Sequence, residues 1–163
     1  MLLQTPAQRE RLLARIKTVA LVGASEKPSR ASFFVARYLR GNGLTVYPIN
    51  PGHQSIDGEP AYASLSDLVA ARGIPDVVDV FRRPDLLMPL VEEAIALKIP
   101  AIWFQYGVVN PEATRRAEEA GMDVVADRCM KVEHARFAGG LSIAGLNSGI
   151  VSAKRRPTPD KTG

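Results

Sequence analysis

A short apolar strand that runs into a glycine turn, and from there into a helix, constrains the fold of this chain most strongly. Residues 18–22 read Thr-Val-Ala-Leu-Val, and Gly23 follows directly. A helix is expected within a dozen residues, because Phe34, Val35 and Leu39 lie at helical spacing. In the first unit of a nucleotide-binding sheet, backbone N–H groups at such a turn and at the helix N-terminus favour an anion. A phosphate-bearing ligand is therefore the leading expectation, although a glycine that serves packing alone would leave the same pattern.

Apolar runs and helical patterns alternate along the rest of the chain. Strands are expected at 44–50, 76–81, 101–105 and 123–126, and helices at 64–69, 85–95, 110–121 and 131–137, with Ser64, Asp85 and Asn110 as N-caps. Pro48 implies that the second strand ends near it or loses a ladder hydrogen bond. The alternation predicts an α/β fold, a single Rossmann-like domain with a doubly wound parallel sheet of about five strands in the order 3-2-1-4-5.

The length of 163 residues fits one domain with a proper core. Residues 1–17 are expected to add a helix, residues 18–140 to form the ligand-binding domain, and residues 141–163 to form a C-terminal extension with a disordered basic tail. The net charge is +4, but the last ten residues hold four cations and one anion. The rest of the chain is close to neutral, so nucleic-acid binding is not expected.

Cysteine content and hydropathy indicate the compartment. Cys129 is the single cysteine, which excludes an internal disulfide framework and suits a reducing environment. No apolar run approaches the ~20 residues that span a bilayer, and the first residues lack the basic and apolar pattern of a signal peptide. A cytoplasmic protein that does not bind membranes is expected.

Polar and glycine-containing segments follow each expected strand, where ligands bind in a sheet of this kind. They are residues 23–28, 50–52, 81–84, 105–107 and 127–129. Cations lie in three of them and shortly after: Lys27, Arg30, Arg82, Arg83, Arg128 and Lys131. Such a set favours a ligand with several phosphates, unless these cations are merely solvated loop residues.

A dinucleotide fits this pattern less well. Of the Gly-x-Gly-x-x-Gly fingerprint, residues 23–28 keep only the first glycine. No acidic residue follows the second strand before Asp57, so nothing there matches the ribose-binding acid. NAD is disfavoured, whereas NADP stays open because Lys27 or Arg30 could face its extra phosphate.

Several segments together resemble the signature of small stand-alone CoA-binding proteins. They are Val-Gly-Ala-Ser at 22–25, Tyr-Pro-Ile-Asn-Pro at 47–51, Phe-Arg-Arg-Pro at 81–84, Trp-Phe-Gln-Tyr-Gly at 103–107, Asp-Arg-Cys at 127–129 and Glu-His-Ala-Arg at 133–136. The resemblance covers about residues 18–137. That family is similar in fold to the CoA-binding domain at the start of the succinyl-CoA synthetase alpha subunit.

The resemblance implies coenzyme A as the cofactor, with its phosphates at the turn after the first strand and its remainder along the next strand ends. The residues implied to bind it are Gly23, Ala24, Ser25, Lys27, Arg30, Ser32, Asn50, Pro51, Phe81, Arg82, Arg83, Pro84, Gln105, Tyr106 and Gly107. It implies no reaction. The larger ligases carry a phosphorylated histidine in a further domain, and His53 and His134 match no such site.

Two side chains raise the question of chemistry. Cys129 follows Arg128, whose charge favours a thiolate, and is a candidate redox residue, although a buried structural cysteine is the commoner case. Asp79 lies inside an apolar strand, where an unpaired carboxylate is costly, so pairing with a cation or a helix N-terminus is expected. No metal-ligand spacing and no Ser-His-Asp arrangement is visible.

We therefore expect a protein that binds CoA or acyl-CoA as a carrier, sensor or regulator, without an assigned reaction and with no catalytic residue assigned. The alternative is an enzyme, either an NADP-linked oxidoreductase or one that transforms acyl-CoA through Cys129. A protein-interaction module with an unidentified protein partner is the third class, and it would leave the strand ends without a ligand.

Overall fold

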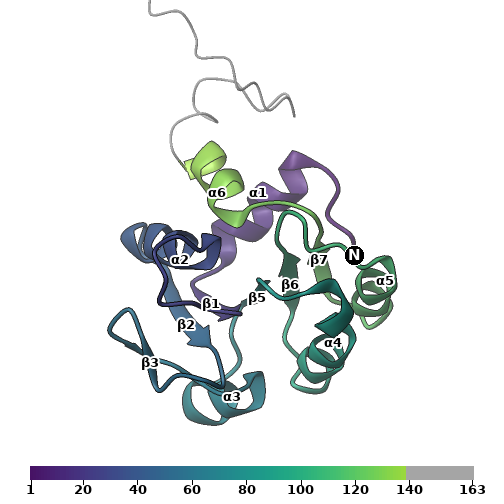
Figure 1. Ribbon diagram of the computed structural model, residues 1–163. Coiled ribbons are helices and arrows are strands. Elements are labelled where there is room, and N and C mark those ends of the chain that lie inside the picture. Colours follow the sequence, from purple (N-terminus) through teal and green to yellow (C-terminus); the bar gives the residue numbers. More distant parts are fainter. Residues whose placement is uncertain (139–163) are drawn as a thin grey trace, which may run out of the picture.

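A five-stranded parallel sheet lies at the centre of the molecule, with helices on both of its faces (Figure 1). The structure is a computed structural model and describes residues 1–138. The strands of the sheet are β1 (Thr18–Val22), β2 (Thr45–Ile49), β5 (Val77–Val80), β6 (Ala101–Phe104) and β7 (Asp123–Val125). The α/β fold, the parallel sheet and the single domain are thus confirmed.

The helices form two layers. One layer consists of α1 (Pro6–Arg15), α2 (Ala31–Gly41) and α6 (Met130–Ala138), and the other of α3 (Leu65–Arg72), α4 (Leu87–Ala96) and α5 (Pro111–Glu119) (Figure 1). Strand side chains alternate between the layers: Val19 and Leu21 pack under the first, Ala20 and Val22 under the second. Both faces are covered, which is why the strands read as continuous apolar runs.

The predicted strand order was wrong. The observed order is β2-β1-β5-β6-β7, which is 2-1-3-4-5 when the five strands are numbered along the chain, so β2 is an edge strand. Pro48 gives the physical reason. Its carbonyl accepts a hydrogen bond from the Tyr62 N–H (2.9 Å) on the outer side of β2, so its nitrogen, which has no hydrogen, faces the same way. In an interior strand that nitrogen would leave a neighbouring carbonyl unpaired, and an edge strand avoids the loss.

This order moves the position in the sheet at which the order of the strands reverses. The reversal falls between β1 and β5, so Gly23 lies beside Phe81, whereas the predicted order would have placed Gly23 beside the end of β6. The approach is close, because a Cβ atom added to Gly23 would lie 1.9 Å from the Phe81 carbonyl oxygen. Ligand sites of doubly wound sheets form at such a reversal.

Two of the three expected N-caps are present. Ser64 Oγ accepts from the Asp67 N–H (3.1 Å), and Asn110 Oδ1 accepts from the Ala113 N–H (3.1 Å). Asp85 does not cap α4, which contradicts the prediction. A 3-10 turn, η1 (Pro84–Leu86), precedes that helix, and the Asp85 carboxylate pairs with the Arg83 guanidinium at 2.6 Å instead.

A small hairpin was not expected in the loop after β2. β3 (Ser55–Ile56) and β4 (Glu59–Pro60) pair antiparallel, and the turn between them places both Asp57 and Gly58 at positive φ. Two-residue strands carry too little periodicity to be recognised in a sequence. Tyr62, two residues after β4, bridges to Ile49 and so covers the outer edge of β2.

The N-terminal segment joins the main core. Leu2 bridges to Val124 beside β7, and Leu12 and Leu13 of α1 are buried in the first helical layer. The C-terminal extension expected at 141–163, and the end of the expected domain at 139–140, lie outside the described residues. Among the helices of residues 1–138, none has the length and apolar character needed to cross a membrane.

Candidate ligand-binding groove

Two adjoining cavities lie along the carboxyl ends of the parallel strands. The first, here the turn cavity, measures about 370 Å³ and lies at the turn after β1. The second, here the strand-end cavity, measures about 530 Å³ and lies between the ends of β5 and β6 and the start of α6. Both are lined by Ala31 and Phe81, so together they form one groove.

The free backbone donors of the turn cavity differ from those that the sequence suggests. The N–H groups of Gly23 and Ala24 both donate to the Ile49 carbonyl, at 3.1 and 3.4 Å, and so close the turn. The N–H groups of Ser25, Ala31 and Ser32 have no acceptor within residues 1–138. The donors that remain free for an anion are therefore mainly those at the start of α2, whose N-cap Arg30 makes no side-chain cap hydrogen bond.

The start of α2 gives the turn cavity a positive potential. A helix N-terminus carries about half a positive charge, and Arg30 adds a full one at the cavity wall. Asn50, on the other wall, is held by the fold: its Nδ2 donates to the Ala24 carbonyl (2.8 Å) and its Oδ1 accepts from the Gly52 N–H (2.8 Å). Asn50 shapes the turn with both ends of its amide.

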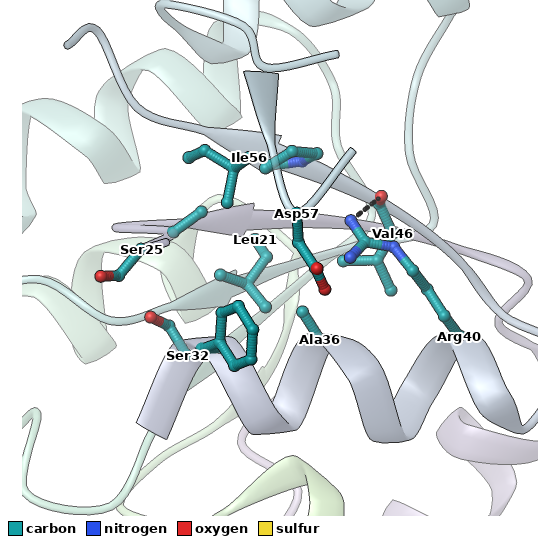
Figure 2. A pocket seen from close by; sticks show the side chains of 11 residues that line it. Leu21, Ser25, Ser32, Ala36, Arg40, Val46, Ile56 and Asp57 are labelled. Carbon is teal, nitrogen blue, oxygen red and sulfur yellow. Dashed lines mark hydrogen bonds between the residues drawn. The ribbon is translucent and has the colours of Figure 1, made fainter. Parts of the chain in front are cut away.

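A third cavity lies behind the turn and is far smaller. It measures about 10 Å³, and Figure 2 shows it between α2 and the edge of the sheet, with Ser25 and Ser32 at one end and Arg40 and Asp57 at the other. Arg40 donates to the Val46 carbonyl at 2.9 Å. A space of this size holds about one water molecule, so it is an internal packing gap and not a ligand site.

The strand-end cavity has a mainly apolar wall. Phe81, Tyr106, Val108 and Val132 line it, and Tyr106 is 78% exposed. Exposed aromatic and aliphatic side chains around a cavity are typical of a surface that an apolar part of a ligand covers.

A buried carboxylate lies under this cavity. Asp79 on β5 is fully buried, and Gln105 Nε2 donates a hydrogen bond to Asp79 Oδ1. The sequence led us to expect a cation or a helix N-terminus as the partner of Asp79. The observed partner is instead the side chain of Gln105, at the end of the neighbouring strand β6. Burial raises the pKa of Asp79 to about 7, although hydrogen bonds from Gln105 and the Val80 N–H oppose the shift.

A buried ion pair supports the far wall of the strand-end cavity. Arg9 Nε on α1 and Glu133 Oε2 on α6 lie 2.9 Å apart, with both side chains at most 3% exposed. Arg9 also donates to the Gln4 carbonyl (2.8 Å), and Arg128 Nη1 lies 3.9 Å from Glu133 Oε1. The pair holds the start of α6 against α1 and places Arg128 at the mouth of the cavity.

Cys129 lines the strand-end cavity, but no histidine adjoins it in the described structure. His134 Nδ1 lies 3.0 Å from the Tyr38 hydroxyl, on the side of α6 that faces α2, and burial lowers the pKa of this imidazole. Among residues 1–138, no group of three His, Cys, Asp or Glu side chains could hold a metal ion. Cys129 therefore shares its cavity wall with Asp127, Arg128 and Glu133, and His134 is not placed to act as its base.

The groove unites ten of the residues named from the sequence. Those that line it are Gly23, Ala24, Ser25, Arg30, Ser32, Asn50, Phe81, Gln105, Tyr106 and Cys129. The others lie outside both cavities: Lys27, Pro51, Arg82, Arg83, Pro84 and Gly107. Of these, Arg83 is turned toward Asp85, and Gly107 donates its N–H to Asp127 Oδ1 (2.8 Å), which fixes the loop after β6.

Some lining residues were not named as site residues from the sequence: Ala31, Val108, Asp127, Arg128, Val132 and Glu133. Asp127 and Glu133 were visible only as parts of motifs, whereas Arg128 was also one of the cations noted at the strand ends. Cys129 directly precedes α6, and Val132 and Glu133 follow it by three and four positions, so this helical spacing was the signal that could have found the wall. Ala31 and Val108 carry no chemical signal of their own.

The fold and this groove define a Rossmann-like domain that is suited to a phosphate-bearing ligand with an apolar portion. The chain belongs to the CoA binding domain family, because the model of that family matches residues 17–135.

Several proteins are similar to this chain over most of its length. The Uncharacterized protein YneT of Bacillus subtilis is 36% identical over 135 residues, which are 82% of this chain and 98% of YneT. A solved structure of a hypothetical protein from Pyrococcus horikoshii has a TM-score of 0.79 and 42% identity, and the match covers 83% of this chain and 94% of that one. The ADP-forming acetate–CoA ligase I of Archaeoglobus fulgidus is 27% identical over 136 residues, 75% of this chain but only 19% of the ligase.

Proposed function

We propose that this protein binds coenzyme A or an acyl-CoA in the groove and acts as a carrier, sensor or regulator that catalyses no reaction of its own. One observation carries the proposal: a cavity with free helix N-terminal donors and a cation continues, through Ala31 and Phe81, into a cavity with an apolar wall. Coenzyme A has a similar division, with phosphates at one part and, at another, a long arm of methyl and methylene groups that also carries a hydroxyl and two amides.

The phosphates belong in the turn cavity. Ser25, Ala31 and Ser32, whose N–H groups are free within residues 1–138, line this cavity, and Arg30 supplies a charge-assisted partner. Among the residues implied by the resemblance, Lys27 and Arg82 lie close in sequence to the cavity without lining it. They add positive potential to its surroundings and are not expected to be direct contacts.

The arm of the cofactor belongs in the strand-end cavity. Phe81, Tyr106 and Val132 cover apolar surface there, and Gln105 supplies a polar group on the floor. An acyl group on the thiol would extend along the same apolar wall. Membership of the family supports the ligand, and the two cavities support its direction.

A calorimetric titration with CoA, dephospho-CoA, NADP and NAD tests the proposal. We expect CoA to bind measurably and NAD not to bind, because the turn lacks the dinucleotide fingerprint and β2 is not followed by an acidic residue that would hold the ribose. Tight NAD or NADP binding without any response to CoA would overturn the proposal in favour of an oxidoreductase.

Cys129 gives the same experiment a second arm, because it lines the cavity assigned to the arm. Since His134 is not placed to activate its thiol, we expect Cys129→Ser to keep its CoA affinity within about twofold. A wild-type protein that consumed acyl-CoA, together with a Cys129→Ser variant that did not, would show instead that the protein is an acyl-CoA-transforming enzyme.

A further inference from the structure

Two buried polar side chains, Asp79 and Gln105, lie together at the floor of the strand-end cavity, and the inner strands of the described sheet carry no second pair of this kind. Asp79 is fully buried, and Gln105, which lines the cavity, is 3% exposed. Asp79 Oδ1 accepts a hydrogen bond from Gln105 Nε2, whereas Asp79 Oδ2 has no partner within residues 1–138. Burying a carboxylate with one unpaired oxygen costs free energy, so the fold alone gives little reason for an acid here.

The acid does determine which end of the Gln105 amide reaches the cavity. An ionised carboxylate can only accept hydrogen bonds, so Gln105 must turn its Nε2 toward Asp79. The other end of the amide, Gln105 Oε1, makes no hydrogen bond in the described part of the chain. Unlike Asp79 Oδ2, it is not fully buried. Because Gln105 lines the cavity, its Oε1 is the atom left facing it.

We propose that Asp79 is a positioning residue: it fixes the amide of Gln105 so that Gln105 Oε1 faces the strand-end cavity as an acceptor for an N–H group of the ligand. This inference rests on the proposed function, because the arm of coenzyme A carries two secondary amides, each with one N–H donor. An adenosine nucleotide without the arm has no such group to place there. The pair Asp79 and Gln105 thereby selects for the arm and not for the phosphates.

An asparagine in place of Asp79 would hold the same space without the same control. Its side-chain amide can accept from Gln105 Nε2 or donate to Gln105 Oε1, so Gln105 could present either end to the cavity. A ligand N–H would then meet a donor in part of the molecules. The negative charge of Asp79, and not the shape of its side chain, restricts the Gln105 amide to one orientation.

Adenosine 3′-phosphate 5′-diphosphate, which has the phosphates of CoA but not its arm, provides the direct test beside CoA itself. At about pH 8 we expect Asp79→Asn to weaken CoA binding about five- to tenfold, the effect of one lost hydrogen bond, and to leave the affinity for the armless nucleotide within about twofold. Asp76→Asn is the matched control. It lies at the other end of β5, where Asp76 accepts from the Lys17 N–H (2.7 Å) and the Thr18 N–H (3.0 Å), far from the groove.

Gln105→Met is the second variant, and it keeps the test open should Asp79→Asn fold poorly. It removes the acceptor, so we expect the same selective loss of CoA affinity, and no additional loss when Asp79→Asn is combined with it. Equal weakening of both ligands by Asp79→Asn would show a purely structural role and overturn the inference. Unchanged CoA affinity would overturn it as well.

A pH profile separates orientation from simple packing. As Asp79 takes up a proton, its hold on Gln105 is lost, so the preference of wild-type protein for CoA over the armless nucleotide should fall between about pH 8 and about pH 6. The preference of Asp79→Asn should not show this fall. The terminal phosphate of the armless nucleotide is not esterified and takes up a proton of its own near this range. The readout is therefore the difference between the profiles of wild-type protein and Asp79→Asn, in which the titration of the ligand itself cancels.

Other charged groups lie on the elements that pack over this face of the sheet, and none of them is among the causes of the raised pKa of Asp79. They are Arg9, Glu10, Arg11 and Arg15 on α1, Arg30, Arg37 and Arg40 on α2, and Arg128, Lys131, Glu133, His134 and Arg136 at α6. Burial lowers the pKa of His134, and because this imidazole is common to wild-type protein and Asp79→Asn, its contribution drops out of their difference. Wild-type protein that bound neither ligand would refute the proposed function itself, whereas binding of CoA with the same pH profile of the preference in both proteins would refute only the role of Asp79.

Discussion

Position 23 requires a glycine because of the neighbouring strand β5, whether or not a ligand is bound. Its φ of +83° lies in the left-handed region, and a Cβ atom there would meet the Phe81 carbonyl oxygen at 1.9 Å. That oxygen belongs to the backbone of β5's end and cannot move aside without shifting the strand. A single glycine thus allows the two strands on either side of the sheet's reversal to approach, and the turn cavity opens directly above this contact.

Replacing Gly23 should therefore cost far more than its φ angle alone. We expect Gly23→Ala to lower the free energy of unfolding by more than about 3 kcal/mol, measured by urea denaturation, because steric overlap adds to the strain of a left-handed alanine. Gly43→Ala is the control, since Gly43 has a φ of +87° but open space around it, and should cost about 1–2 kcal/mol. Equal losses in the two variants would refute the steric contact.

Asp79 should leave a mark on stability as well as on binding. Its pKa is raised to about 7 in the folded protein from an ordinary value of 3.8, so the folded state holds a proton that the unfolded chain releases. Stability is therefore lost as the pH rises between these two values. The free energy of unfolding of wild-type protein, taken relative to Asp79→Asn, should fall by about 3 kcal/mol from about pH 5 to about pH 8. A difference that stays constant across this range would show that Asp79 remains ionised throughout.

At the level of the elements, the sequence was sufficient where periodicity and caps are local. Each of the five main strands was placed within a few residues, and Ser64 and Asn110 cap their helices as expected. The strand order was not recovered, because it depends on which strands pair across the sheet. Pro48 held the missing information: a proline that turns its nitrogen outward belongs on an edge strand.

The candidate site shows the same division. The turn at Gly23 and the strand-end residues Phe81 and Gln105 could be named from the sequence, because each directly follows an apolar run. The cations could not be sorted. Whether a flexible arginine lines a cavity, as Arg30 does, or pairs with a neighbouring acid, as Arg83 does, depends on contacts between segments that the sequence does not reveal.

The contact between α1 and α6 rests on a buried ion pair whose removal has a predictable sign. Arg9→Met removes the close partner of the buried Glu133 carboxylate and leaves it the partly exposed Arg128 guanidinium at 3.9 Å, so we expect a loss of about 3–5 kcal/mol in the free energy of unfolding. The double variant Arg9→Met with Glu133→Leu should recover most of that loss. Arg116→Met breaks a partly exposed pair with Glu92 and should cost no more than about 1 kcal/mol. If the double variant were as unstable as Arg9→Met, the cost would lie in packing and not in the buried charge of Glu133.

On the scale of the whole molecule, the first helical layer both builds the core and borders the groove. α2 presents its N-terminus to the turn cavity, while α6 carries Val132 and Glu133 along the strand-end cavity, and α1 holds α6 in place through Arg9 (Figure 1). The second layer, α3 to α5, packs on the opposite face of the sheet. A ligand in the groove would therefore contact the sheet edge and one layer, and its binding should stabilise that layer in particular.

The division of the groove between phosphates and arm makes the arginines separable by mutation. Arg30 lines the turn cavity and has no ion-pair partner within residues 1–138, whereas Arg83 is exposed and pairs with Asp85. We expect Arg30→Ala to weaken CoA binding by about 1–3 kcal/mol, as for a charge-assisted hydrogen bond to a phosphate, and to weaken the armless nucleotide equally. Arg83→Ala should change neither affinity by more than about twofold. Calorimetry at two salt concentrations completes the test, since a phosphate contact also weakens with ionic strength. A large effect of Arg83→Ala with none of Arg30→Ala would place the phosphates over η1 and not at the start of α2.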